Sequence, residues 1–409
     1  MLMKDLLFIG FVWPEPSTTA AGARILQLIE LFQDNNYKIT FVCAASKTTK
    51  SFNLNKLNIQ TFIIELNNSS FDEFIKQLNP TLVLFDRYLT EEQFGWRVVK
   101  NCPNALRILD TEDLHFLRNA RQIAYKKKIP VSEGLLKNDI TKREIASIFR
   151  CDLTLVISKY EIKLLKRFFG VDKSLLHYVP FLLKKVNLPN SYPSFIGRKD
   201  FITMGNFKHA PNLDSVMYLK TTIWPLVKKE LPNAKLHVYG AYSTQKIQQL
   251  HSVKDGFLIN GWAESIEKVF TNAKVCLAPL QFGAGLKGKL IDSMKYGTPS
   301  VTTTIGAEAM HNKLPWNGFI TNNPIDFALK SVKLYSDKLI WENAQKNGIE
   351  IINKCFSKEK YSHKLINKIN FLQEKIIEHR LNNFIGTILM HHTLNSTKYF
   401  SKWIEEKNK

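Results

Sequence analysis

A glycine-spaced turn with two lysines follows the apolar run 274–280. Gly283 and Gly285 come first, and Lys287 and Lys289 lie just beyond them, where a helical pattern begins. Glycines let the backbone approach a phosphate closely, and the N-terminus of a helix presents unpaired N–H groups to an anion. The lysine ammonium groups add positive charge at the same place. These residue types in this order predict a binding site for a diphosphate.

A carboxylate and a second loop of small residues accompany this turn. Asp292 lies near the start of the helix, where it can accept hydrogen bonds from sugar hydroxyls, and Gly297 and Pro299 end the helix. A loop around Gly306 follows the next apolar stretch. The alternative interpretation is a glycine-rich turn with two solvated lysines, as in any α/β protein. The spacing and the second loop favour a diphosphate clamp beside a hydroxyl-binding carboxylate.

A second group of charged side chains follows an apolar run in the first half of the chain. It contains Asp110, Glu112, Asp113, His115 and Arg118. Helix capping is the simpler explanation for each single acid. A cluster of this density at the end of a strand more often forms a functional site.

The elements that must position these groups alternate between strand-like runs and helical patterns in both halves of the chain. This alternation predicts an α/β protein with two doubly wound, Rossmann-like domains. The predicted division is an N-terminal domain 1–181, a linker 182–199 rich in Pro, Asn and Ser, a C-terminal domain 200–355 and a helical C-terminal extension 356–409.

Two shorter segments carry specific expectations. Residues 118–142 are basic and poorly periodic, which predicts a mobile loop on the acceptor side. Ser158 and Glu161 have the spacing of a capping box at the start of a helix.

Composition narrows the possible partners. The 409 residues carry a formal net charge of +21, which suits either nucleic acid or an anionic membrane surface. No recognised nucleic-acid module is present, and basic and apolar residues occur together at 125–128 and 162–169, so we expect peripheral membrane contact and no nucleic acid. The five cysteines are widely spaced, which fits a reducing cytosol. No apolar run approaches the ~20 residues that a transmembrane helix needs.

The segment FGAGLKGKLIDSMKYGTPSVTTTIGAEAM, residues 282–310, resembles the donor-binding segment of GT-B glycosyltransferases, in particular the retaining family four, also called glycosyl transferases group 1. Members carry a similar glycine turn followed by K-x-x-E-A-M-A-x-G-x-P-V-V. The resemblance implies two domains facing a cleft, with Lys287 or Lys289 on the donor diphosphate. It also implies that Asp292 contacts the ribose and that the Gly306 loop approaches the phosphate or sugar.

The segment departs from the family pattern at two carboxylates. Asp292 stands where glutamate is usual, and the earlier glutamate of the family's pair has no counterpart, because Ala284 and its neighbours are uncharged. Glu308, in the following loop, is our hypothesis for the missing carboxylate.

Other parts of the family pattern suggest further cleft residues. The opening loop resembles one near the donor phosphates, which implicates Gly22 and Arg24, although Arg24 also fits a surface arginine. The loop G-N-F-K-H-A-P-N-L-D, residues 205–214, resembles the first donor-side loop and implicates Gly205 and Lys208. Trp262 is a candidate for stacking on the nucleotide base, with a core tryptophan as the alternative.

The acidic segment resembles the place where a histidine or aspartate of the N-terminal domain reaches the sugar. By this resemblance His115 is the catalytic candidate, with Asp113 or Glu112 orienting it. The acids do not form D-x-D, the metal-binding signature of the other large glycosyltransferase fold, so no metal is expected.

The resemblance implies a hexosyltransferase-type, retaining enzyme without a cofactor, which moves a sugar from a nucleotide-diphosphate sugar to an acceptor hydroxyl. A glycan or lipid-linked acceptor of bacterial surface glycan or glycolipid synthesis is expected, in the cytoplasm or at the inner face of the membrane. The alternatives are a nucleotide-sugar 2-epimerase of the same fold, a catalytically silent GT-B-like scaffold and a basic nucleic-acid-binding protein.

Overall fold

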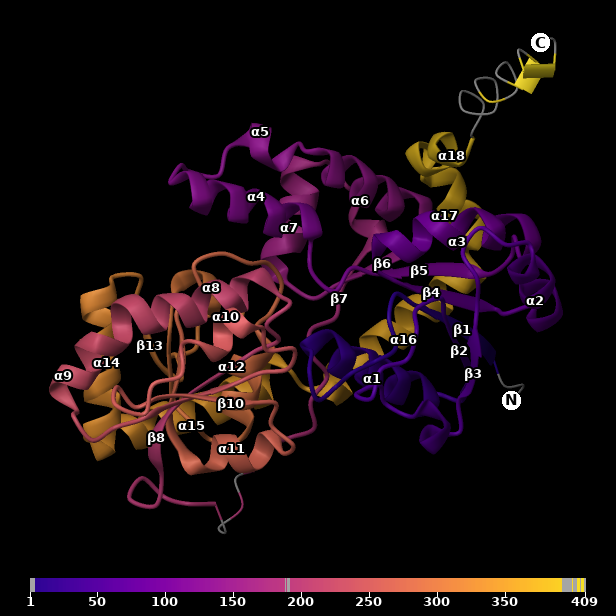
Figure 1. Cartoon of the computed structure of the whole chain (residues 1–409). Coiled ribbons are helices and arrows are strands. Elements are labelled where there is room, and N and C mark those ends of the chain that lie inside the picture. The colour runs from indigo at the N-terminus through magenta and orange to yellow at the C-terminus, as the bar shows by residue number, and fades with distance from the viewer. Residues whose placement is uncertain are drawn as a thin grey trace.

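The chain folds into two α/β domains connected by an extended segment (Figure 1). The computed structural model describes residues 4–187, 189, 192–391, 399, 403, 404, 406 and 407. Each domain contains one sheet of parallel strands between layers of helices, because strands that are apolar on both faces must be covered on both. This architecture confirms the predicted α/β class with two doubly wound domains.

The N-terminal sheet has the strand order β3-β2-β1-β4-β5-β6-β7. Its chain winding reverses between β1 and β4, and sheets of this kind bind ligands beyond the carboxyl ends of the strands at the reversal. The strands are β1 Lys4–Gly10, β2 Tyr37–Cys43, β3 Gln60–Ile63, β4 Leu82–Asp86, β5 Leu106–Asp110, β6 Leu153–Val156 and β7 Leu176–Tyr178.

The C-terminal sheet repeats this plan with the order β10-β9-β8-β11-β12-β13. The reversal here lies between β8 and β11, whose carboxyl ends lead into the 205–214 loop and the glycine turn. The strands are β8 Lys199–Met204, β9 Leu236–Tyr239, β10 Phe257–Gly261, β11 Ala273–Ala278, β12 Ser300–Thr302 and β13 Gly318–Ile320.

Helices of mixed polarity cover both sheets. Those of the first half are α1 Ala20–Gln33, α2 Ser70–Leu78, α3 Arg87–Asn101, α4 His115–Lys127, α5 Glu133–Leu136, α6 Asp139–Arg150 and α7 Lys159–Phe168, with short 3₁₀ turns η1 Leu54–Leu57 and η2 Lys173–Leu175. The second half contains α8 Ala210–Tyr218, a π-helical turn η3 Leu219–Ile223, α9 Trp224–Glu230, α10 Gln245–Gln248, α11 Ile266–Asn272, α12 Gly288–Lys295, α13 Thr304–Ala307, α14 Pro324–Ser336 and α15 Lys338–Cys355.

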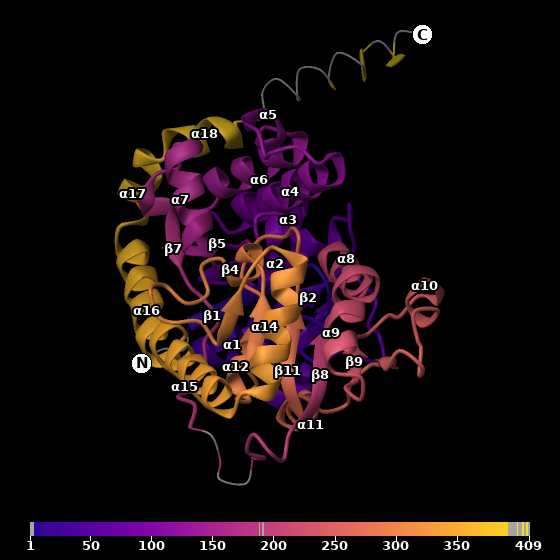
Figure 2. The same ribbon diagram turned by 90° about the vertical axis from the view of Figure 1, so that its left-hand side faces the viewer.

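The last helices return to the N-terminal domain. Figure 2 shows α15 and then α16 Lys358–Glu374, α17 Ile376–Asn382 and α18 Phe384–Met390 as one band from the C-terminal domain along the N-terminal one. Four side chains of α16 belong to the same buried apolar cluster as β1 and α1: Tyr361, Leu365, Ile369 and Leu372. The core of the first domain is therefore completed by residues near the end of the chain.

Two expectations about local structure were wrong. Residues 118–142 are largely helical, because the apolar face of α4 packs into the domain core through Leu117, Ala120 and Ala124. Ser158 starts α7 but makes no capping hydrogen bond with its side chain, and Glu161 points elsewhere. The predicted linker 182–199 lies between β7 and β8, and its residues 188, 190 and 191 fall outside the described part, as do many residues of the predicted extension beyond 391.

Among the described helices, none combines the length and apolarity needed to cross a bilayer.

Candidate functional site

A cleft of about 910 Å³ lies between the two domains, beyond the carboxyl ends of both sheets. Most residues that the sequence predicted for a site line it: Gly22, Asp113, His115, Gly205, Lys208, Trp262, Gly283, Gly285, Lys287, Lys289 and Asp292. Arg24, Gly306 and Glu308 are not among the lining residues. Segments far apart in the sequence thus meet at one surface.

The glycine turn after β11 has a backbone that requires glycine at two positions. Gly283 and Gly285 have φ angles of 146° and 62°, in the region where a side chain is strained. Helix α12 begins directly afterwards, with Lys287 as its N-cap. Because the first residues of α12 line the cleft, the unpaired N–H groups of its first turn lie at the cleft wall.

The two lysines of the turn have different environments. Nζ of Lys287 donates to the carbonyl oxygens of Ala284 at 3.0 Å and Gly285 at 2.8 Å, so this side chain braces the turn. In the described part of the chain, Nζ of Lys289 has no hydrogen-bond or ion-pair partner. Burial lowers the pKa of both ammonium groups to about 8. Lys289 is therefore the lysine of this turn that is available to an anion.

Asp292 lies one turn into α12 and lines the cleft. Burial raises the pKa of its carboxyl group to about 6. Its carboxylate makes no hydrogen bond or ion pair with any described residue, so its oxygens are available to hydroxyl donors.

The N-termini of two helices from different domains meet beside Lys289. A Cβ atom added to Gly288, the first residue of α12, would lie 2.6 Å from Cβ of Ala20, the first residue of α1. A Cβ atom at Gly22 would lie 2.5 Å from the carbonyl carbon of Glu15. Glycine at these places permits the close approach, which brings two positive helix ends to one side of the cleft.

The 205–214 loop also lines the cleft. Gly205 follows β8, and a Cβ atom there would lie 2.6 Å from Cγ of Asn212, so glycine keeps the loop tight. Nζ of Lys208 lies 3.9 Å from the ring centroid of Tyr242. Burial and the charge of Arg118 lower the pKa of the neighbouring His209 to about 4.

His115 begins α4 at the opposite wall. Its Nε2 lies 3.9 Å from Oδ1 of Asp113, and its Nδ1 lies 3.5 Å from Oε1 of Glu144. Glu144 also accepts the backbone N–H groups of His115 and Phe116, each at 3.1 Å, and so caps the helix. Asp113 is close to the imidazole, as the sequence predicted for an orienting residue, whereas Glu112 makes no contact of this kind.

Both oxygens of the Asp113 carboxylate accept hydrogen bonds. NH1 of Arg118 donates to its two oxygens at 2.6 and 2.5 Å. Burial opposes its ionisation, but the charges of Arg118, His115 and His209 hold the pKa of Asp113 well below its usual range.

Glu161 connects the acidic segment to the glycine turn. Its Oε1 accepts the N–H of Leu114 at 3.2 Å and, across the domain boundary, the N–H of Gly285 at 2.8 Å. Burial and the nearby charge of Asp113 raise the pKa of Glu161 to about 8. The side chain that the sequence assigned to a capping box instead holds the two walls together.

Arg24 does not fit its predicted place near the phosphates. It is fully buried, and its guanidinium donates to the Asp110 carboxylate at 2.8–3.1 Å and to the carbonyls of Val179 and Pro180. The pair connects α1 to the ends of β5 and β7. We assign Arg24 a structural role.

The two predicted residues in the segment after β12 also lie outside the cleft. The Glu308 carboxylate forms a two-pronged ion pair with Arg121 of the N-terminal domain, at 2.8 and 2.7 Å. Gly306 lies in the short helix α13, where a Cβ atom would lie 1.9 Å from Oγ1 of Thr302. The expected loop is therefore a helical turn packed on its own strand, and Glu308 is occupied by a partner.

Contacts between the domains close one end of the cleft. Oη of Tyr242 donates to the Glu15 carboxylate at 2.7 Å, and Nε1 of Trp262 donates to the carbonyl of Ser17 at 3.3 Å. Nζ of Lys50 lies 3.7 Å from the Trp262 ring centroid. One face of the predicted base-stacking ring is thus covered by the N-terminal domain.

Sequence reasoning missed the side chains that bridge the domains, among them Glu15, Arg121, Glu161 and Tyr242. Nothing in their local spacing marks them, because each partner lies more than 100 residues away. The positive φ angles of Arg87 and Glu112 were also invisible in the sequence.

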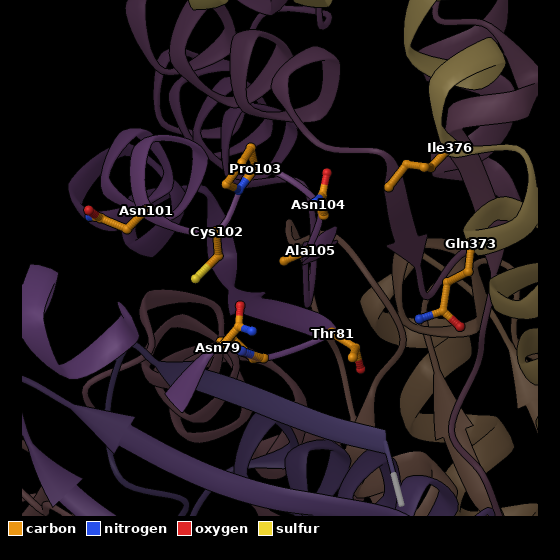
Figure 3. A pocket seen from close by; sticks show the side chains of 10 residues that line it. Asn79, Thr81, Asn101, Cys102, Pro103, Asn104, Ala105, Gln373 and Ile376 are labelled. Carbon is orange, nitrogen blue, oxygen red and sulfur yellow. The ribbon is translucent and has the colours of Figure 1, made fainter. Parts of the chain in front are cut away.

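A smaller cavity, of about 370 Å³, lies at the other end of the N-terminal strands (Figure 3). Loops before β4 and β5 line it together with Gln373 and Ile376 of α16 and α17. Its polar groups are mostly amides, and none of the predicted site residues faces it. Among the described residues, no group of three or more His, Cys, Asp or Glu side chains is arranged to hold a metal ion.

Comparison with known proteins agrees with this geometry. Residues 198–337, from the start of β8 to the end of α14, match the family described as Glycosyl transferases group 1. A Klebsiella pneumoniae protein described as an uncharacterized 44.6 kDa protein in the cps region is 26% identical over 269 residues, which cover 62% of this chain and 66% of that protein.

Solved structures match the whole architecture. Sucrose-phosphate synthase of Thermosynechococcus elongatus superposes with a TM-score of 0.69 at 14% identity, covering 90% of this chain and 99% of that one. HepE of Anabaena, solved with UDP and glucose, gives a TM-score of 0.66 at 11% identity over 90% of this chain and 100% of that one. The fold is GT-B, and residues 198–337 of the C-terminal domain resemble the glycosyl transferases group 1.

Proposed function

We propose that the protein transfers a sugar from a nucleoside-diphosphate sugar to an acceptor hydroxyl during the synthesis of a surface glycan. The single observation that carries the donor assignment is the ammonium group of Lys289, which has no hydrogen-bond or ion-pair partner among the described residues and lies at the N-terminus of α12 inside the cleft between the domains. A leaving diphosphate gathers negative charge as the glycosidic bond breaks, and preorganised cations and N–H groups stabilise that charge.

The surrounding groups fit the rest of a donor. The Asp292 carboxylate, which has no hydrogen-bond or ion-pair partner among the described residues, suits the ribose hydroxyls, and the 205–214 loop with Lys208 adds positive charge. HepE of Anabaena was solved with UDP, so UDP is the first nucleotide to test. The match to a protein of a cps region supports a capsule-like or other surface glycan as product.

We further propose retention at the anomeric carbon and catalysis without a metal or other cofactor. The family resemblance supports retention. Lys289 and the two helix N-termini give the diphosphate a positive environment from the protein itself, which supports independence from a metal.

We also propose peripheral contact of the acceptor side with an anionic membrane at its inner face. Residues 125–134 are all exposed, and Tyr125, Ile129 and Val131 lie next to Lys126, Lys127 and Lys128. Apolar side chains beside lysines suit a surface of anionic headgroups. Flotation with phosphatidylglycerol vesicles should exceed that with phosphatidylcholine and fall when the three lysines become glutamate. Equal flotation with both lipids would contradict this contact.

A thermal-shift screen with UDP, GDP, ADP, CMP and their sugars tests the donor site. One nucleotide series should raise the melting temperature of the wild-type protein. Lys289→Ala should abolish that shift, whereas Lys229→Ala, an exposed lysine on α9, should retain it. A shift that survives Lys289→Ala, or no shift with any nucleotide, would contradict the donor site. Release of a free epimerised sugar without an acceptor would identify an epimerase instead.

A further inference from the structure

The C-terminal wall lacks a carboxylate next to its glycine turn. Ala284 occupies the middle of the turn, and Glu308, the nearest acid in the following segment, is held by Arg121. The turn does, however, lie against two acidic residues of the other domain. A Cβ atom at Gly285 would lie 2.8 Å from Cβ of Asp113 and 3.5 Å from the carbonyl oxygen of Glu112.

Three acids of the N-terminal domain come close enough to act beside this turn. Both carboxylate oxygens of Asp113 already accept hydrogen bonds from Arg118. Glu161 is completely buried, does not line the cleft and accepts two backbone N–H groups. Glu112 lines the cleft, its Oε1 is buried, and its carboxyl group has no hydrogen-bond partner among the described residues. Glu112 is therefore the acid that remains available.

Glu112 has a cationic neighbour at the end of the adjacent strand. β4 and β5 pair in parallel with Asp86 opposite Asp110, so Arg87 and Glu112 follow neighbouring strand ends. Both line the cleft. The guanidinium of Arg87 makes no hydrogen bond with the described residues; its Nε lies 3.7 Å from Oδ1 of Asp86, a buried atom that also has no hydrogen-bond partner.

The backbone at both positions is strained. Arg87 has a φ of 70° and Glu112 a φ of 60°, which residues with long side chains rarely adopt. Such conformations cost about 1–3 kcal/mol each and concentrate at functional sites. Two of them lie on adjacent strand ends, and neither charged side chain makes a hydrogen bond with the described residues, which indicates that this geometry serves a ligand.

We propose that Glu112 and Arg87 form a subsite for two hydroxyl groups of the transferred sugar. The carboxyl oxygens accept from one hydroxyl, and the guanidinium donates to the oxygen of its neighbour. The subsite rests on the proposed function, because it lies beside the diphosphate clamp and would bind the sugar that is attached to the diphosphate.

Titration calorimetry that compares a diphosphate with its sugar isolates this contact. The probes are UDP against UDP-glucose and GDP against GDP-mannose. With the pair that binds, Glu112→Gln should raise the Kd of the nucleotide sugar at least tenfold and change the Kd of the diphosphate less than threefold. Glu92→Gln, at a half-buried glutamate that pairs with Arg143 and does not line the cleft, is the matched control and should change neither.

A second variant separates binding from folding. Glu112→Gly removes the carboxyl group and also relieves the positive φ, so its melting temperature should not fall while its preference for the sugar is lost. A wild-type preference for the nucleotide sugar that survives both Glu112 variants would overturn the subsite, as would a wild-type protein that binds the diphosphate and gains nothing from the sugar. Failure to bind any nucleotide of the thermal-shift screen would instead refute the proposed function on which the subsite rests.

Discussion

The carboxylate of Glu308 lies against the guanidinium of Arg121 in a two-pronged ion pair that joins the two domains. The same guanidinium donates to the carbonyl oxygen of Gly283 at 2.8 Å, within the glycine turn. One arginine of α4 therefore fixes both the turn and the segment after β12 relative to the N-terminal wall. This pair is one of the contacts that hold the two walls of the cleft together.

Breaking the Arg121–Glu308 pair should open the cleft. Glu308→Gln should increase the radius of gyration in solution scattering and reduce kcat, because closure is needed to exclude water. A double-mutant cycle with Arg121→Met should give a coupling energy of about 0.5–3 kcal/mol. If Glu308 were instead a catalytic carboxylate, Arg121→Met would leave its contribution to kcat intact and the cycle would be additive.

Nucleotide affinity should depend on pH through Lys289. Its pKa of about 8 in the empty cleft means that the ammonium form dominates below pH 8 and is lost above it. An anion binds the protonated form, so the Kd for UDP should be lowest below pH 8 and rise from pH 8 to 9.5. Lys289→Arg stays charged in this range and should flatten the profile. A wild-type Kd that is constant from pH 7 to 9.5 would contradict this role.

Stability should depend on pH through Glu161. Its folded pKa of about 8 exceeds the ordinary glutamate value of 4.5, so the folded state binds the proton more tightly than the unfolded state does. This contribution is complete below pH 4.5 and is lost as the pH rises through 8. Relative to Glu161→Gln, which keeps the acceptor oxygen, the wild type should lose at least about 1.4 kcal/mol over this window, the equivalent of one pKa unit. Parallel stability curves for the two proteins would show that Glu161 does not titrate there.

Arg24 should contribute to the stability of the folded protein and not to donor binding. Removing the guanidinium leaves Asp110 buried without its partner, which costs about 3–5 kcal/mol in buried pairs. Arg24→Lys retains the positive charge but loses the planar guanidinium that donates to both oxygens of Asp110. It should therefore lower the denaturant midpoint while the UDP affinity of the folded protein is unchanged. A wild-type denaturant midpoint with weakened UDP binding would mean that Arg24 contacts the donor phosphates, as the sequence predicted.

A cavity-creating substitution in α16 should show that this helix is part of the N-terminal core. Leu365 is fully buried in the N-terminal core, whereas Phe371 on the same helix is 56% exposed. Leu365→Ala should destabilise the protein by about 2–5 kcal/mol. Phe371→Ala should change the denaturant midpoint little. Equal effects of the two substitutions would mean that α16 does not belong to that core.

The sequence predicted what depends on local pattern. Strands such as β11, the turn at Gly283 and Gly285 and the helix after it follow from apolar periodicity and glycine spacing, and the structure confirms them. The α/β class and the meeting of the turn with the acidic segment at one cleft also followed, since parallel strands end at a common edge.

What the sequence could not predict depends on contacts between distant segments. Arg24, Glu161 and Glu308 are the same residue types that would serve a ligand, and only the fold shows that Asp110, Gly285 and Arg121 already occupy them. In the same way, Lys287 and Lys289 are equivalent in spacing, and the carbonyl oxygens that engage Lys287 depend on the exact path of the turn.

The return of α16 to the first domain has a consequence for synthesis on the ribosome. The β1–α1 half of the protein emerges first, but its apolar surface stays uncovered until Tyr361 to Leu372 have been translated. The second domain, whose sheet and α14–α15 cover are contiguous in sequence, can reach its native packing earlier. The domain that is translated first is thus the last to complete its core. A nascent chain stalled before α16 would expose this apolar surface to chaperones and proteases.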